Sequence, residues 1–107
     1  MIADEGGAAA AFVADVTDEQ QAKAMVAAAV EQFGRLDCLD NNVGIGGRGS
    51  VVDVAVESWR RVMQVNVDSM FLASRHAIPA MKETAGGGAI VNVSSISNAA
   101  APSGRWR

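Results

Sequence analysis

The stretch that decides the fold runs from Gly86 to Asn98 and reads GGGAIVNVSSISN. A glycine turn leads into a short apolar run of mostly β-branched residues, and the run ends on Ser94 and Ser95. An apolar run bounded by turn signals is typical of a strand buried on both faces, as in a parallel sheet covered by helices. Ligands of open α/β sheets bind beyond the carboxyl ends of such strands. We therefore expect a strand over residues 89–93 with a functional site at its end.

Strands and helices alternate through the preceding sequence. Thr17 and Gln20 form a capping-box pattern at the start of an amphipathic helix that Gly34 ends. A longer helical pattern contains Pro79, which we expect to bend or break it locally. The expected elements are, in order, a strand over 10–16, a helix over 17–33, a strand over 36–41, a helix over 57–83 and the strand over 89–93. This alternation predicts an α/β fold with a parallel sheet and crossover helices.

The composition is that of one small globular domain or part of one. The chain has 107 residues and a net charge of −3, without a basic stripe, so we expect no nucleic-acid partner. No apolar stretch approaches the roughly 20 residues that span a bilayer, so we expect no membrane segment. Cys38 is the single cysteine, which excludes an intrachain disulfide and favours a reducing cytoplasmic setting. We predict no metal site.

Four motifs stand in order along the chain: Asp15-Val16-Thr17-Asp18, Asn41-Asn42-Val43-Gly44, Trp59 with Val65-Asn66-Val67, and the segment from Gly88 to Ser95. In this order and at this spacing they resemble the central motifs of the short-chain dehydrogenase/reductases, from Ala3 to about Ala101. The resemblance implies that residues 1–107 form a partial NAD(P)-binding Rossmann domain, with strands three, four and five of a doubly wound parallel sheet and two crossover helices. It also implies hydride transfer between NAD or NADP and a small-molecule carbonyl or alcohol.

The resemblance assigns the cofactor-binding residues. Asp15 would hydrogen-bond the adenine amino group, with Val16 beside the adenine ring. The alternative for Asp15 is that it only caps the helix that follows. The contacts along the ribose and nicotinamide would come from Asn41, Asn42, Val43 and Gly44.

The catalytic residues are assigned in the same way. Ser95 would hydrogen-bond the substrate oxygen, with Ser94 as a secondary contact, and Asn66 would organise a proton-relay water. A positioned hydroxyl donor suits this chemistry because hydride transfer to a carbonyl builds negative charge on the oxygen. Without the resemblance, the residues alone favour a structural interpretation of Asn66, as a buried asparagine bonded to nearby backbone or as a plain surface asparagine.

The sequence departs from the family pattern at several points. The glycine-rich phosphate loop and the YxxxK pair are not found, and the chain contains no tyrosine. We therefore expect the 107 residues alone to be inactive, although the full-length form would be a homodimer or homotetramer. The alternative is a non-catalytic truncated product, either inert or associating with an intact homologue through its long helix.

The family strand order also has a geometric consequence. Strands one and two would lie between strand 10–16 and strand 36–41, so without them a gap of about 14 Å is expected, three spacings of about 4.7 Å. We expect the chain either to keep this gap or to pair the two strands directly. Asp40 replaces an apolar residue of the family on a central strand, where burial would be costly.

Overall fold

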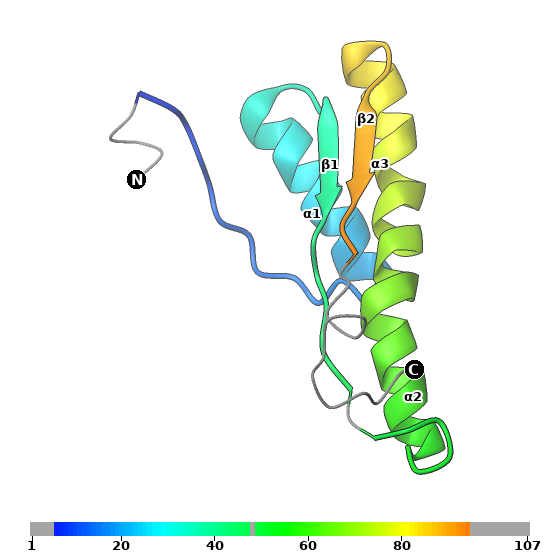
Figure 1. Ribbon diagram of the computed structural model, residues 1–107. Helices are drawn as coiled ribbons and strands as arrows, with labels where there is room; N and C mark the ends of the chain where they lie inside the picture. Colours follow the sequence, from blue (N-terminus) through cyan, green and yellow to red (C-terminus); the bar gives the residue numbers. More distant parts are fainter. Residues whose placement is uncertain (1–5, 48, 95–107) are drawn as a thin grey trace.

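The computed structural model describes residues 6–47 and 49–94 (Figure 1). Among these, the regular elements are α1 (Glu19–Phe33), β1 (Cys38–Asn41), α2 (Val56–Met63), a π-helix η2 (Gln64–Asp68), α3 (Ser69–Ala85) and β2 (Ala89–Asn92). The two strands pair in parallel, with Cys38 opposite Ala89 and Asn41 opposite Asn92. The predicted α/β class with a parallel sheet is therefore confirmed, although each strand is shorter than expected.

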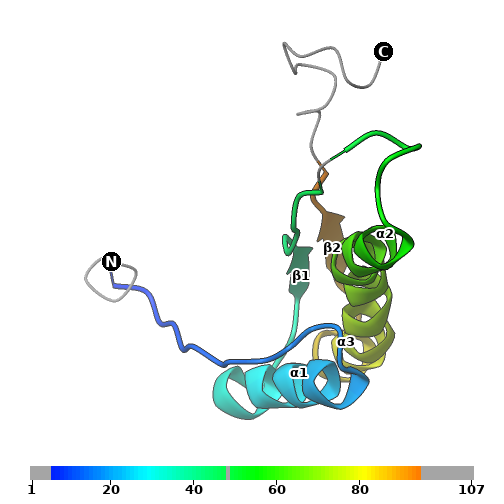
Figure 2. The same cartoon turned by 90° about the horizontal axis from the view of Figure 1, so that it is seen from below.

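Both long helices cover one face of this small sheet, as Figure 2 shows. They run antiparallel to the strands and pack against each other (Figure 1). The core between them is formed by Val26, Ala77 and Met81, and the partly buried apolar side chains packed around it are Met25, Leu36, Leu39, Ala80 and Ile90. Because no described element covers the other face, the expected burial of residues 89–93 on both faces is wrong here, and Val91 is 53% exposed.

The strand predicted over residues 10–16 does not form. This segment has no regular structure and runs away from the sheet (Figure 1), with Phe12 52% and Val13 99% exposed. A strand needs a neighbour to satisfy its backbone groups, and no described strand lies beside this one. The segment does not pair with β1, so the direct pairing that was one of the two expected outcomes is not found. Asp40 is consequently exposed on β1, so the cost expected for a buried carboxylate does not arise here.

The helix boundaries differ from the sequence patterns in two places. The N-cap of α1 is Asp18, whose side chain accepts a hydrogen bond from Gln20 N, so Thr17 is not the cap. Pro79 does not break α3, which is continuous from Ser69 to Ala85. The irregular part of the long helix is instead the π-helical turn η2, which directly precedes α3. Single π-helical turns inside α-helices are frequent at functional sites.

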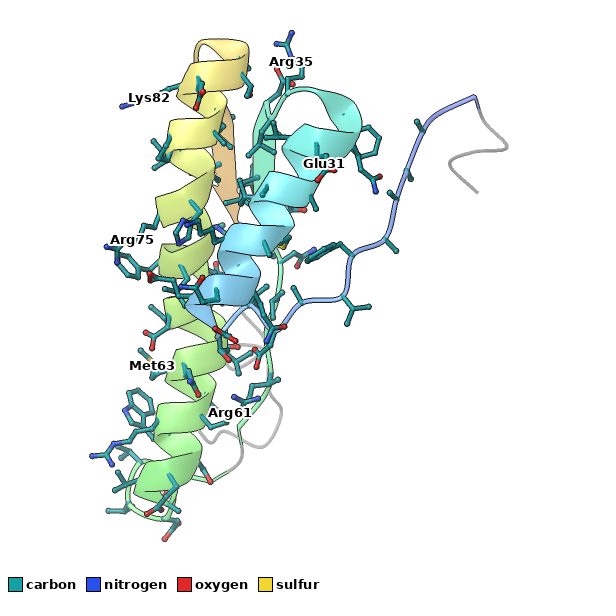
Figure 3. All side chains as sticks on the ribbon, turned by 180° about the vertical axis from the view of Figure 1, so that it is seen from behind. Glu31, Arg35, Arg61, Met63, Arg75 and Lys82 are labelled. Atoms are coloured by element: carbon teal, nitrogen blue, oxygen red, sulfur yellow. The ribbon has the colours of Figure 1, made fainter. Side chains whose placement is uncertain are left out.

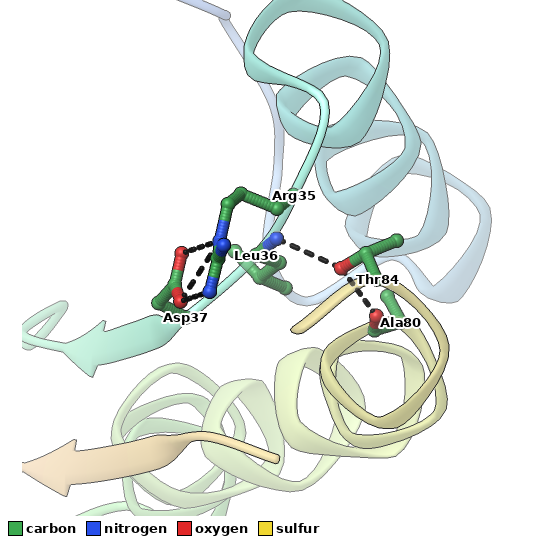
Figure 4. Close-up of polar contacts among 5 residues, drawn as sticks. All are labelled: Arg35, Leu36, Asp37, Ala80 and Thr84. Carbon is green, nitrogen blue, oxygen red and sulfur yellow. Dashed lines mark hydrogen bonds and ion pairs between the residues drawn. The ribbon is translucent and has the colours of Figure 1, made fainter. Parts of the chain in front are cut away.

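The entry into β1 is fixed from the end of α3. Leu36 N donates a hydrogen bond to Thr84 Oγ1 at 3.0 Å, and that hydroxyl donates to Ala80 O at 2.7 Å (Figure 4). Arg35 and Asp37 form an ion pair at 2.7 Å beside it, in which both side chains are largely exposed. Thr84 therefore connects the strand to the helix, whereas the ion pair contributes little because water screens it.

Candidate functional site

The polar residues predicted from the motifs gather at the carboxyl edge of the two-stranded sheet. Both strands end at the same edge because they are parallel, and Val93 N donates to Asn41 O at 3.0 Å just beyond them. Asn42 to Gly44 follow β1, and Ser94 follows β2 as an exposed residue. Ser95 lies outside the described residues.

Asn66 reaches the segment after β1 from η2. Its Oδ1 accepts a hydrogen bond from Ile45 N at 2.7 Å, and its Nδ2 donates to Ile45 O at 2.9 Å. Both polar groups of one backbone residue are thus paired with one amide side chain. The π-helical turn presents Asn66 toward this edge, so residues from β1, the loop and the long helix meet there. The side chain of Asn66 is therefore bonded to backbone, which is one of the alternatives that the sequence left open.

Gly44 is the residue of this segment that lies against Asn66. A Cβ built at Gly44 would be 3.3 Å from Asn66 Oδ1, closer than an ordinary contact. At Gly46, two residues on, a Cβ would meet nothing within 4 Å. The close approach of backbone to Asn66 therefore explains a glycine at position 44, and no such contact constrains position 46.

Asn41 is placed differently from its neighbours Asn42 and Val43. It is 8% exposed, and its Nδ2 donates to Asn92 Oδ1 at 2.9 Å and to Ser74 Oγ at 3.4 Å. The side-chain amide is therefore engaged within the sheet and against α3. Neither Asn92 nor Ser74 was predicted from the sequence to have a role at this site. The signal that could have found Asn92 is an asparagine at the last position of both strands.

Asp15 and Val16 lie just before α1, and the first turn of α1 lies near the level at which the two strands end (Figure 1). Asp15 Oδ1 accepts hydrogen bonds from Thr17 Oγ1 at 2.6 Å and from Thr17 N at 2.9 Å. These bonds, with a smaller effect of the Arg61 charge, hold the pKa of Asp15 below its usual value. Arg61 lies on the side of α2 that faces the start of α1 (Figure 3).

Asp15 nevertheless keeps an acceptor that a ligand could use. Oδ1 receives both bonds from Thr17, whereas Oδ2 has no hydrogen bond within the part of the chain that the structure describes. Asp15 thus stabilises the turn before α1 without being the helix cap, which is Asp18, and it still presents a carboxylate oxygen.

The described ranges 6–47 and 49–94 contain neither a metal-binding cluster nor a membrane-crossing helix. No group of three or more side chains there is arranged to hold a metal ion. No helix in these ranges is both long and apolar enough to cross a membrane.

Comparison with known proteins identifies the family. The sequence model of the short chain dehydrogenase family matches residues 1–105. The chain is 52% identical over 82 residues to trans-4-hydroxycyclohexanecarboxylate dehydrogenase of Sinomonas cyclohexanicum, which is 77% of this chain and 31% of that protein. It is 44% identical over 92 residues to cyclohexanol dehydrogenase of an Acinetobacter species, covering 85% of this chain and 36% of that protein.

The fold agrees with these sequence matches. The crystal structure of a short chain dehydrogenase from Mycobacterium smegmatis superposes with a TM-score of 0.82 and 40% identity, over 98% of this chain and 41% of that one. The chain therefore belongs to the short-chain dehydrogenase/reductase family of oxidoreductases and has part of its Rossmann-type fold. It spans about a third of the length of the curated relatives named above.

Proposed function

We propose that these residues are the partial NAD(P)-binding domain of an oxidoreductase that transfers hydride between NAD or NADP and an alcohol or carbonyl substrate. The observation that carries the proposal is the pair of hydrogen bonds between Asn66 and Ile45. They join the helix residue expected in a proton relay to the loop expected to hold the nicotinamide half of the cofactor. Family membership supports this assignment of the two segments.

Two groups of residues in this chain fit such a cofactor, one for its adenine and one for its nicotinamide half. Asp15 Oδ2 can accept a hydrogen bond from the adenine amino group, with Val16 beside the ring. Asn42 to Gly44 are exposed, and Gly44 has no side chain to obstruct a ligand. When bound, the cofactor would supply or accept the hydride. The buried side-chain amide of Asn41 is bonded to Asn92 of the other strand. Asn41 would therefore contribute to cofactor binding indirectly, by positioning the segment 42–44 that follows it.

The catalytic groups would act on the substrate oxygen. Ser95 would donate a hydrogen bond to this oxygen and stabilise its developing negative charge. Because the side chain of Asn66 is engaged with Ile45, Asn66 would hold the relay water through its backbone. The chain has no tyrosine, so the acid–base group that the family provides is not among these 107 residues. We therefore propose that they are inactive alone.

The test uses a protein that contains this chain and any sequence flanking it in the same reading frame. We call it the flanked protein. Cyclohexanol and 4-hydroxycyclohexanecarboxylate are suitable first substrates, because they are named for similar proteins. We expect the reduced nicotinamide to form with NAD or NADP, and Ser95→Ala to lower kcat about 100-fold or more while Ser94→Ala has a smaller effect. Absence of turnover with a panel of alcohols and carbonyls, in a protein shown to be folded, would refute the proposal.

A second candidate is a non-catalytic product that is inert or associates with an intact homologue. The observation that favours it is the apolar outer surface of the continuous helix, where Trp59 is 55% and Phe71 60% exposed. The same surface would join copies of the flanked protein in a homodimer or homotetramer. Mixing the 107-residue chain with an intact homologue and measuring mass in solution tests it. A mixed complex that Phe71→Glu abolishes supports it, and separate species contradict association.

The remaining assignments follow the same proposal. The partner is a small molecule, with neither nucleic acid nor membrane. A cytoplasmic location agrees with the free thiol of Cys38, which is exposed on β1.

A further inference from the structure

The last residues of the two strands form a polar junction that the sequence motifs do not assign. Asn41 and Asn92 stand opposite each other in the parallel register, and Asn41 Nδ2 donates to Asn92 Oδ1 at 2.9 Å. The second acceptor is Ser74 Oγ of α3, at a longer 3.4 Å. Because Asn41 is 8% exposed, its amide is withdrawn from water and depends on these two acceptors.

This junction lies where the cofactor-binding segment and the serine-bearing segment of the proposed site leave the two strands. The chain continues from Asn41 into the segment 42–44, which is proposed to contact the cofactor. From Asn92 it continues through Val93 and Ser94 toward the proposed catalytic serine. The backbone bond between Val93 N and Asn41 O, at 3.0 Å, holds the strand ends at this level. The side-chain bond adds a second connection at the same level, outside the sheet ladder.

We propose that Asn92 is a positioning residue for hydride transfer. Its Oδ1 accepts from the buried Asn41 amide and fixes the separation between the cofactor-binding segment and the serine-bearing segment. This inference rests on the proposed function. A displacement of about 1 Å at a reacting centre costs up to about 100-fold in rate, so a small change in this separation affects kcat. Contacts to the remainder of the cofactor are unaffected, so its affinity changes little.

Three variants of the flanked protein test this role. Asn92→Leu has a similar shape without the acceptor, and we expect kcat to fall about 10- to 100-fold while the cofactor Kd stays within about threefold. Asn92→Asp keeps an oxygen acceptor, and a charge-assisted bond to Asn41 should hold kcat within about threefold of the parent. Val91→Thr, at a half-exposed position of the same strand, is the matched control and should behave as the parent.

Several outcomes would overturn the inference. One is an unchanged kcat in Asn92→Leu, and another is an equal loss in Asn92→Asp, which would make side-chain shape the cause. A cofactor Kd that weakens in parallel with kcat would indicate a merely structural role. If Asn92→Leu does not fold, Asn92→Ala is measured with the same expectations.

A second readout separates this inference from the proposed function. If the parent binds no nicotinamide cofactor and turns nothing over, the proposed function fails and the positioning role fails with it. The Asn41 side-chain amide protons then decide whether the junction itself exists. We expect slow exchange of the bonded proton in the parent and in Asn92→Asp, and fast exchange in Asn92→Leu. Equal exchange in all three would contradict the junction.

Discussion

Removing the Asn66 side chain should release the loop after β1 without unfolding the protein. In Asn66→Ala, Ile45 loses the acceptor of its N–H at 2.7 Å and the donor to its carbonyl at 2.9 Å. Each bond contributes about 0.5–1.5 kcal/mol net, or about 1–3 kcal/mol for the pair. Ile45 is partly accessible to water, which compensates for part of the loss, so we expect the lower half of this range.

Amide hydrogen exchange at Ile45 in the flanked protein measures this quantity directly. A loss of about 1–2 kcal/mol in local opening free energy corresponds to exchange about 5- to 27-fold faster, at about 1.4 kcal/mol per factor of ten. Amides in the middle of α3 should keep their rates, because the helix core does not depend on Asn66. Gln64→Ala in the same π-helical turn is the control.

An Ile45 exchange rate within about twofold of that of the parent would mean that the two bonds contribute almost nothing, and would contradict this role of Asn66. This role would equally be refuted if Gln64→Ala accelerated exchange as much as Asn66→Ala. In that case the effect would come from altered helix geometry and not from the amide side chain.

Three further predictions concern stability and pH. Gly88→Ala should lower the free energy of unfolding, measured in urea, by about 1–3 kcal/mol. The added Cβ would lie 2.6 Å from the sulfur of Met81 and 2.7 Å from the backbone oxygen of Asp37. The control Gly46→Ala places its Cβ in open space and should unfold like the parent. Thr84→Val should cost about 1–3 kcal/mol in the same assay, since it leaves the part-buried amide before β1 without an acceptor. Asp15 titrates below its usual pKa of 3.8 in the folded state, so its contribution to stability is present above that value and is lost as the pH falls through the lower folded pKa. Thr17→Val should raise the pKa of Asp15 in a carboxyl NMR titration, and an unchanged pKa would contradict the assignment.

The sequence predicted those elements whose partners are present in the chain. Helix α1 and the strands around Leu39 and Ile90 bury their apolar side chains against one another, so periodicity and turn signals located them. The run over 10–16 has the same apolar character, but its neighbours in the family's sheet order are not in this sequence. A strand depends on hydrogen bonds to another segment, and its own sequence cannot supply them.

The site was predicted to the extent that its residues belong to known motifs. Asn66 and Gly44 could be named from those motifs, and the structure brings them into contact. The pairing of Asn66 with Ile45 was not predictable, because it arises from a π-helical turn that periodicity read as ordinary helix. The Asn41–Asn92 bond requires the strand register, which the sequence does not state.

The central claim is that the carboxyl edge of β1 and β2 binds a nicotinamide cofactor. The most direct test is to add NAD or NADP to the isotope-labelled flanked protein and record which backbone amides shift. We expect saturable shifts at residues 42–44 and at Asp15 and Val16, with little change at the far ends of α1 and α3. Binding without shifts at either segment, or no binding of either cofactor, would contradict it.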